Sequence, residues 1–273
     1  MWWPVIAAVA AGAGYAGAVE PFWIRPVTYE VVVPGLDPGM DGFRILHLSD
    51  LHGRVDVFAR AWFWRWAAGC QLAVVTGDLF AWSLSRARVA RALNALAATL
   101  PTYYVSGNHD WRRGRLAVEP WDPGPGHLDN RAVPLAGGRL WLAGLPDLKR
   151  GRPDWAAVVA ALPVEGPAVL LSHRPDAVLH PACQRFALVL SGHTHGGQVC
   201  LPGGTALVRH TRLPWPYAAG RWEWAPGHTV ITSRGLGESE LPVRFACRPE
   251  VVQVVLRAAA GARVAEGAND VVH

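Results

Sequence analysis

Short apolar runs of this chain repeatedly lead into Asp, Asn or His residues. Five such runs cover residues 43–48, 72–76, 103–105, 168–171 and 186–190. Nearly continuous apolar runs of this length are typical of strands buried on both faces of a sheet. Segments 58–68 and 86–100 instead have the pattern of helices, and further strands are expected at 28–33, 140–143, 228–232 and 251–256. The alternation predicts an α/β domain built in layers.

The polar residues that follow the five runs share one chemistry, because most of them can bind a metal ion. They are Asp50, His52, Asp78, Asn108, His109, Asp110, His173, His193 and His195. Ligands of open α/β sheets bind beyond the carboxyl ends of the strands. We therefore expect these side chains to meet at one rim of the domain.

The types of ligand restrict the metal. The four cysteines lie outside this set and form no CxxC pair, which excludes a structural zinc site of the cysteine type. Imidazole, carboxylate and amide groups suit Mn, Fe, Zn or Co, and do not suit calcium. The set is larger than one ion requires, so the sequence predicts two divalent ions. Such a pair, about 3.5–4 Å apart and bridged by a carboxylate, is a common device for activating water against a phosphoester.

The motifs DLH, GD, GNHD, SH and GHTHGGQ, in this order, resemble those of the calcineurin-like metallophosphoesterases. Segments 235–237, 241–245 and 248–250 extend the resemblance to the membrane-associated bacterial YkuE/YaeI-type phosphoesterases, over about residues 20–256. The resemblance implies a four-layer α/β/β/α sandwich of two mixed sheets flanked by helices. It also implies a dinuclear phosphodiesterase or pyrophosphatase.

Site roles follow from the same resemblance. It assigns Asp50, His52 and His195 to the first ion, Asp78 to both ions, and Asn108, His173 and His193 to the second ion. His109 would be catalytic and not a ligand, and would stabilise or protonate the leaving oxygen. Gly107 and Gly192 would let ligands and backbone approach closely, because they lack a Cβ.

One position departs from the family pattern. Many members read Gly-Asp-x-x-Asp, and the final acid helps to orient the catalytic histidine, whereas this chain has Ala81 at that place. We expect either that Asp110 or another carboxylate acts as the replacement, or that His109 is less well oriented. Asp110 is therefore included among the catalytic candidates.

Residues 1–19 carry no charged side chain, and nineteen helical residues rise about 28 Å, close to the thickness of a bilayer core. A retained membrane anchor is favoured over two alternatives, a cleaved signal ending at Ala16-Gly17-Ala18 and a buried helix. A cleaved signal would need a positively charged start, which is missing. Arg25, with no Lys or Arg before the segment, favours the cytoplasmic face of a bacterial cell membrane.

The expected organisation has four parts. They are a membrane anchor or signal-like helix at 1–20, a linker and edge strand at 21–42, a phosphoesterase domain at 43–256 and a flexible tail at 257–273.

The partner is predicted to be a phosphoester, with lipid-linked compounds among the candidates. Net charge is +5, but the 25 arginines are spread along the chain without a stripe, so no nucleic acid is expected. Two other functions remain open: a catalytically silent metal-binding scaffold and a protein phosphatase. The sequence leaves the choice among Mn, Fe and Zn open. It also leaves the oligomeric state open.

Overall fold

The computed structural model describes residues 2–80, 86–118, 121, 124–215 and 217–259. Ala81 and residues 260–273 of the expected tail therefore lie outside the described residues. The α-helices are α1 (Trp3–Ala18), α2 (Ala61–Ala68), α3 (Arg86–Thr99) and α4 (Trp155–Ala160). The strands are β1 (Arg25–Val33), β2 (Arg44–Leu48), β3 (Leu72–Thr76), β4 (Thr102–Val105), β5 (Trp111–Arg112), β6 (Arg115–Leu116), β7 (Arg131–Leu135), β8 (Leu140–Leu145), β9 (Ala168–Ser172), β10 (Leu188–Ser191), β11 (Gly220–Ala225), β12 (His228–Thr232) and β13 (Glu250–Ala258).

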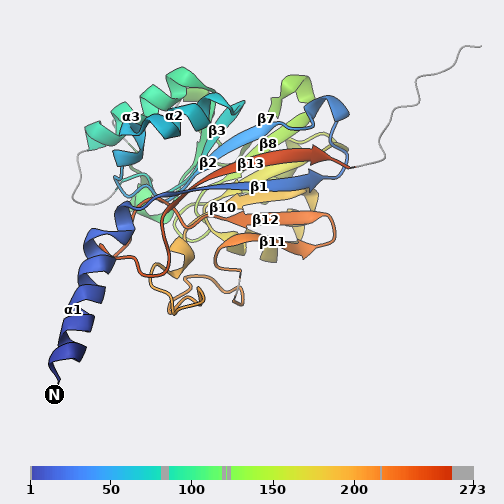
Figure 1. Cartoon of the computed structure of the whole chain (residues 1–273). Helices are drawn as coiled ribbons and strands as arrows, with labels where there is room; N and C mark the ends of the chain where they lie inside the picture. The colour runs from blue at the N-terminus through green and yellow to red at the C-terminus, as the bar shows by residue number, and fades with distance from the viewer. Residues whose placement is uncertain (1, 81–85, 119–120, 122–123, 216, 260–273) are drawn as a thin grey trace, which may run out of the picture.

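Within the described residues, two mixed sheets carry the fold (Figure 1). One has the strand order β1-β13-β2-β3-β4 and the other β11-β12-β10-β9-β8-β7. In the first sheet β2, β3 and β4 are parallel, and in the second β8, β9, β10 and β12 are parallel. The carboxyl ends of each parallel set therefore open at one edge of their sheet.

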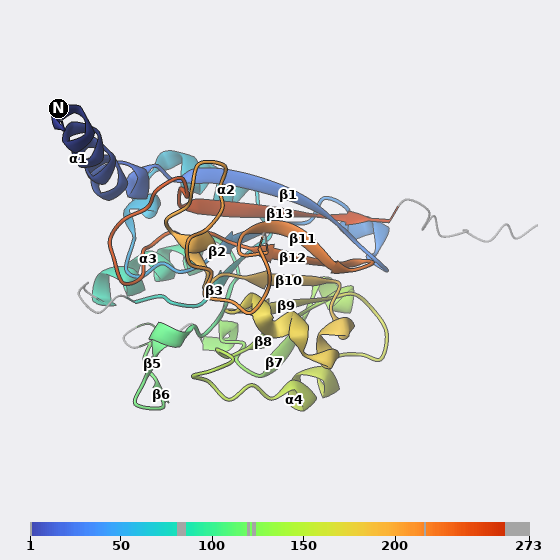
Figure 2. The same cartoon turned by 90° about the horizontal axis from the view of Figure 1, so that it is seen from below.

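The alternation of side chains along each strand divides the apolar residues into three layers. In β2, Ile45 packs between the two sheets, whereas Leu46 and Leu48 pack outward against α2 and α3. On the outer face of the second sheet, Leu170 packs with Val158 of α4, which lies on the side away from β1 in Figure 2. Helix, sheet, sheet and helix thus follow one another, and the predicted four-layer sandwich is confirmed.

Most expected elements are present, with some corrections. The expected helix at 58–68 starts only at Ala61, because Asp56–Ala59 forms a separate 3-10 turn. The expected strand at 186–190 begins at Leu188. β13 continues to Ala258, two residues into the segment expected to be a tail, because it pairs along its whole length with β1. β1 is thereby the edge strand of the first sheet.

Helix α1 projects from the body of the molecule in both views (Figures 1 and 2). None of its residues is buried, so the alternative of a buried helix is wrong. The segment Trp3–Phe22 is long and apolar enough to cross a membrane, by length and composition. At its end Glu20 is buried and accepts the N–H groups of Ala246 and Cys247, at 3.0 and 2.5 Å, which fixes the helix to the domain.

His47, within β2, is fully buried, with Nε2 2.9 Å from the Thr76 hydroxyl. Burial lowers its pKa to about 3, whereas an unfolded chain has about 6.5. Between these values only the unfolded chain binds the proton, so the stability contributed by neutral His47 is lost as the pH falls below about 6.5.

The unfolding free energy of wild type should fall as the pH is lowered below about 6.5. In His47→Gln we expect this fall to be smaller by up to about 1.4 kcal/mol per pH unit. Urea unfolding of metal-free wild type and variant at pH 7, 6 and 5 measures both slopes. Equal slopes would contradict the prediction.

Candidate dinuclear metal centre

Backbone hydrogen bonds join the loop after β2 to the loop after β3, and the loop after β9 to the loop after β10. The His193 N–H links the two pairs by donating to Oδ2 of Asp50 at 3.0 Å. The N–H of Asp50 donates to Gly77 at 3.0 Å, and that of His52 donates to Asp78 at 2.9 Å. The N–H of Gly192 donates to His173, also at 3.0 Å. The expected convergence of the strand ends on one rim is therefore what the structure has.

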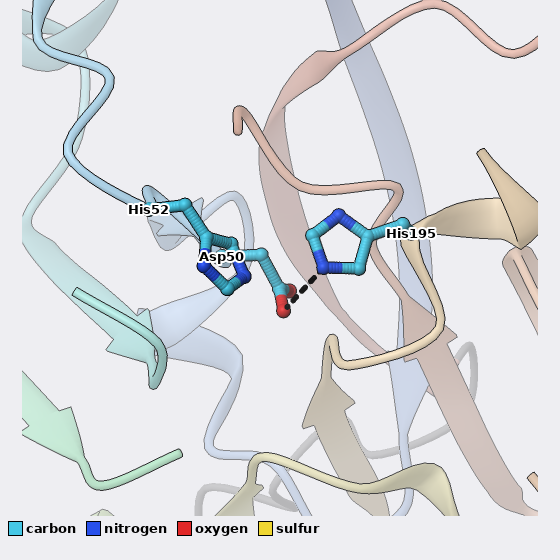
Figure 3. A group of neighbouring side chains, drawn as sticks. All are labelled: Asp50, His52 and His195. Atoms are coloured by element: carbon cyan, nitrogen blue, oxygen red, sulfur yellow. Dashed lines mark ion pairs between the residues drawn. The ribbon is translucent and has the colours of Figure 1, made fainter. Parts of the chain in front are cut away.

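Two groups of metal-competent side chains form at this rim. One group contains Asp50, His52 and His195, which point toward one another in Figure 3, and the other contains Asp78, His173 and His193. Within each group the possible ligand atoms lie within 4.8 Å of one another. The members of each group are residues that the family resemblance assigns to one ion, and their role as ligands stays a prediction.

The Asp78 carboxylate belongs to the second group and also faces the first group. Its Oδ2 is 3.4 Å from Nε2 of His52 in one group and 3.4 Å from Nε2 of His173 in the other. Asn108 joins the second group, with Oδ1 3.1 Å from Nε2 of His173. A carboxylate placed in this way could be shared by two ions.

Backbone carbonyls orient the rings of two of the histidines by contacting Nδ1. Nδ1 of His173 lies 2.7 Å from the Thr76 carbonyl, and Nδ1 of His195 lies 3.0 Å from the Gly237 carbonyl. A ring that donates from Nδ1 keeps Nε2 available as a ligand atom, which is how metal-binding histidines are commonly held. Both rings therefore present Nε2 to the centre.

Five of the predicted ligands have left-handed backbone conformations. The φ angles are 49° for Asp50, 43° for His52, 55° for Asp78, 69° for His193 and 51° for His195. Each such conformation costs a non-glycine residue about 1–2 kcal/mol, so the surrounding fold must impose it. Backbone strain of this kind concentrates at functional sites.

Two glycines make the close packing of the centre possible, as expected. A Cβ on Gly107 would lie 2.2 Å from Oδ1 of Asp78, and a Cβ on Gly192 would lie 2.2 Å from Oδ2 of Asp50. No side chain larger than hydrogen fits at either position without displacing a carboxylate.

The buried carboxylates of the centre favour a positive charge beside them. Burial raises the pKa of the Asp50 carboxyl to about 6. For His173, burial lowers the pKa, but the Asp78 and Asp50 carboxylates outweigh it and raise the pKa to about 10. Without metal, His173 therefore holds a proton beside Asp78, and a cation bound there would release it.

The residues present fit a pair of divalent ions. Nε2 of His52 is buried and has no hydrogen-bond partner among the described residues, although it faces the centre. A buried nitrogen of this kind is costly unless it binds something. Four histidines, two carboxylates and one amide supply the N and O atoms that Mn, Fe and Zn share as ligands.

His109 and Asp110 lie beside this centre with different surroundings. The His109 ring packs edge-on to His52 at 5.0 Å, and the backbone N–H of His109 donates to Oδ1 of Asp78 at 2.8 Å. The Asp110 carboxylate is buried and accepts from the N–H groups of Asp78, Leu79 and Gly107, at 2.8–2.9 Å. Asp110 thus holds the loops of the centre together, and within the described residues it makes no bond to the His109 ring.

Two arginines were not singled out from the sequence. Arg174, directly after His173, donates to Oδ1 of Asn108 at 3.2 Å and contacts Nε2 of His193. Arg244 is fully buried and donates to the carbonyls of Arg234 and Gly237, at 2.9 and 2.5 Å. For Arg174 the available signal was its place directly after the SH motif. For Arg244 it was a charged residue within an apolar segment.

The family model of calcineurin-like phosphoesterases matches residues 43–197, which contain every ligand described above. The chain belongs to the calcineurin-like phosphoesterase family. Among its relatives, the metallophosphoesterase YkuE of Bacillus subtilis is 30% identical, over 90% of each chain. The phosphodiesterase YaeI of Escherichia coli is also 30% identical, over 91% of this chain and 94% of its own. A transmembrane protein with a metallophosphoesterase domain from Danio rerio is 29% identical, over 93% of this chain and 62% of its own.

This membership identifies the chain as a metallophosphoesterase, hence a hydrolase, with candidate ligands for two ions.

Proposed function

We propose that this phosphoesterase cleaves phosphodiesters or diphosphates with two divalent ions, held by the two groups described above. The Asp78 carboxylate, which faces His52 in one group and His173 in the other, carries the proposal. Ions bound there would activate water and neutralise charge on the phosphoryl group.

We assign to His109 the role of the general acid that protonates the leaving oxygen. Its backbone N–H donates to Asp78 and its ring lies against His52, so the imidazole stays beside the metal centre, where a phosphoester would bind. Asp110 is a positioning residue in this proposal, because its carboxylate fixes the backbone of Asp78 and Gly107. A histidine is well suited to general acid catalysis near neutral pH.

Hydrolysis of bis-p-nitrophenyl phosphate and p-nitrophenyl phosphate, before and after chelation, tests the proposal. We expect chelation to abolish cleavage of the diester and added Mn to restore it. His109→Ala should lower kcat for the diester by about 10²–10⁴-fold at unchanged metal content, because general acid catalysis contributes about this factor. His228→Ala, at the start of β12, is the matched control and should keep wild-type activity.

Other results would redirect the assignment. Full metal occupancy without turnover would favour the silent scaffold, and preference for a phosphopeptide would favour a protein phosphatase. Activity that survives His109→Ala would remove His109 as the acid.

The substrate is proposed to be an amphiphile at a membrane surface, such as a lipid-linked phosphoester. A groove of about 440 Å³ runs from His195 between Leu207, Val208, Leu241 and Val243, and is mainly apolar. Beside it, the segment around Arg244 contacts the end of α1, where the Arg244 N–H donates to the Ala16 carbonyl at 2.9 Å. An apolar chain in this groove would lie between the metal centre and the anchor.

Removal of residues 2–18 should release the protein from membranes. The full chain is expected in the membrane fraction, because α1 leaves Trp3, Val5, Ile6 and Val9 exposed. The truncated chain keeps Glu20, which binds the domain, and should be found in the soluble fraction with its diesterase activity intact. Fractionation and activity measurements on both forms check this, and a soluble full chain would contradict the anchor.

A further inference from the structure

A second cavity opens beside the metal centre, on the side of His193. It has a volume of about 660 Å³, and four cationic side chains line it together with one carboxylate, that of Asp176. The cations are Lys149, Arg174, Arg209 and Arg212. Here this space is called the basic cavity.

Arg174 connects the basic cavity to the ligands of the second ion. Its Nε donates to Asp147 at 2.6 Å, which fixes the guanidinium. Its two remaining nitrogens then reach the side chains of Asn108 and His193. A group bound in the cavity would therefore be a direct neighbour of a phosphoester at the centre.

The other cations leave the cavity with an excess of positive charge. The side chains of Lys149, Arg209 and Arg212 are exposed and form no ion pair with any described residue. Asp176 is already engaged, because its carboxylate accepts from the Thr211 hydroxyl at 2.8 Å and from the Arg212 N–H at 2.9 Å. An unpaired cluster of this kind is a binding surface for an anion.

The basic cavity and the apolar groove share one wall. Leu207, Val208 and His210 line both spaces, with the metal centre between His193 on one side and His195 on the other. A substrate that filled both would carry its apolar part toward α1 and a charged part into the cavity.

We propose that the basic cavity binds a second phosphate group of the substrate, next to the one that is cleaved. This inference rests on the proposed function and narrows it, because it selects a diphosphate or another substrate with two neighbouring phosphates. Arginine and lysine are suited to this task, since their donors match phosphate oxygens.

Calorimetry with non-hydrolysable anions tests the inference independently of turnover. The Mn-loaded protein, freed of unbound metal, is titrated with methylenediphosphonate, which has two phosphonates, and with methylphosphonate, which has one. Wild type should prefer the diphosphonate. This preference is the ratio of the affinities for the diphosphonate and the monophosphonate. It should fall about tenfold in Arg209→Gln/Arg212→Gln, and by less in Lys149→Gln, which changes a different loop.

Arg88→Gln/Arg91→Gln on the exposed face of α3 removes the same charge far from the cavity and should keep the wild-type preference. Equal preference in both double variants would overturn the inference. The inference would also be overturned if wild type bound a second equivalent of methylphosphonate and Arg209→Gln/Arg212→Gln did not. The cavity would then bind free phosphate. Absence of diesterase activity in wild type would instead count against the proposed hydrolysis and would leave the calorimetric comparison valid.

Discussion

Asp78→Asn is expected to lower kcat for bis-p-nitrophenyl phosphate by about 10³-fold or more, because enzymes gain much of their rate enhancement by stabilising the charge that develops on the reacting group. The change keeps the size of the side chain, and the amide oxygen can still accept the His109 N–H. What it removes is the negative charge that faces His52 and His173, each at 3.4 Å. Two cations then share no anionic ligand, and we expect the second ion to be lost first.

Metal analysis by mass spectrometry, together with the diesterase assay, measures both effects. Asp154→Asn is the matched control, since Asp154 caps α4 by accepting the Ala157 N–H and asparagine caps helices equally well. A variant with two bound ions and wild-type turnover would show that Asp78 does not bridge.

Gly192→Ala is expected to damage both the stability and the activity of the protein. The added Cβ would lie 1.8 Å from the Ser49 hydroxyl and 2.2 Å from Oδ2 of Asp50, so both side chains must move. Overpacking of this kind costs about 1–3 kcal/mol of unfolding free energy. Misplacement of Asp50 by an ångström should lower kcat by about 10²-fold.

Urea unfolding and the diesterase assay report the two effects separately. Gly69→Ala is the control, because its nearest atom, the Trp66 carbonyl oxygen, would be 3.4 Å away in ordinary contact. Unfolding free energies equal to wild type in both variants would mean that the loop after β10 yields more easily than its contacts imply.

The strands of the two sheets could be predicted where both faces are buried. β3 and β9 are buried at every residue, and their unbroken apolar sequences made them recognisable. β11 was missed because its Arg, Trp and Glu residues alternate without becoming buried, as an edge strand permits. β7 contains Pro134, which argues against a strand by sequence but is tolerated at the edge of a sheet.

The meeting of these side chains at one rim could be predicted, because each lies within four residues after the end of a strand. Their division into two groups came from the family resemblance. The surroundings of the centre could not. Arg174 meets Asn108 and His193 only after three strand-end loops have folded against one another. The basic cavity likewise joins Lys149 to residues some sixty positions later. Contacts of this kind depend on loop geometry, which produces no periodic pattern of residues in the sequence.

The centre draws its ligands from both sheets. Asp50, His52, Asp78 and Asn108 follow strands of the first sheet, and His173, His193 and His195 follow strands of the second. Each predicted ion would therefore cross-link the two halves of the sandwich at an open edge. Binding to the folded state alone stabilises a protein by about 2.7 kcal/mol at a hundred times the dissociation constant. We therefore expect the lifetime of this chain against proteases to follow the supply of metal, so that scarcity would remove the protein as well as its activity.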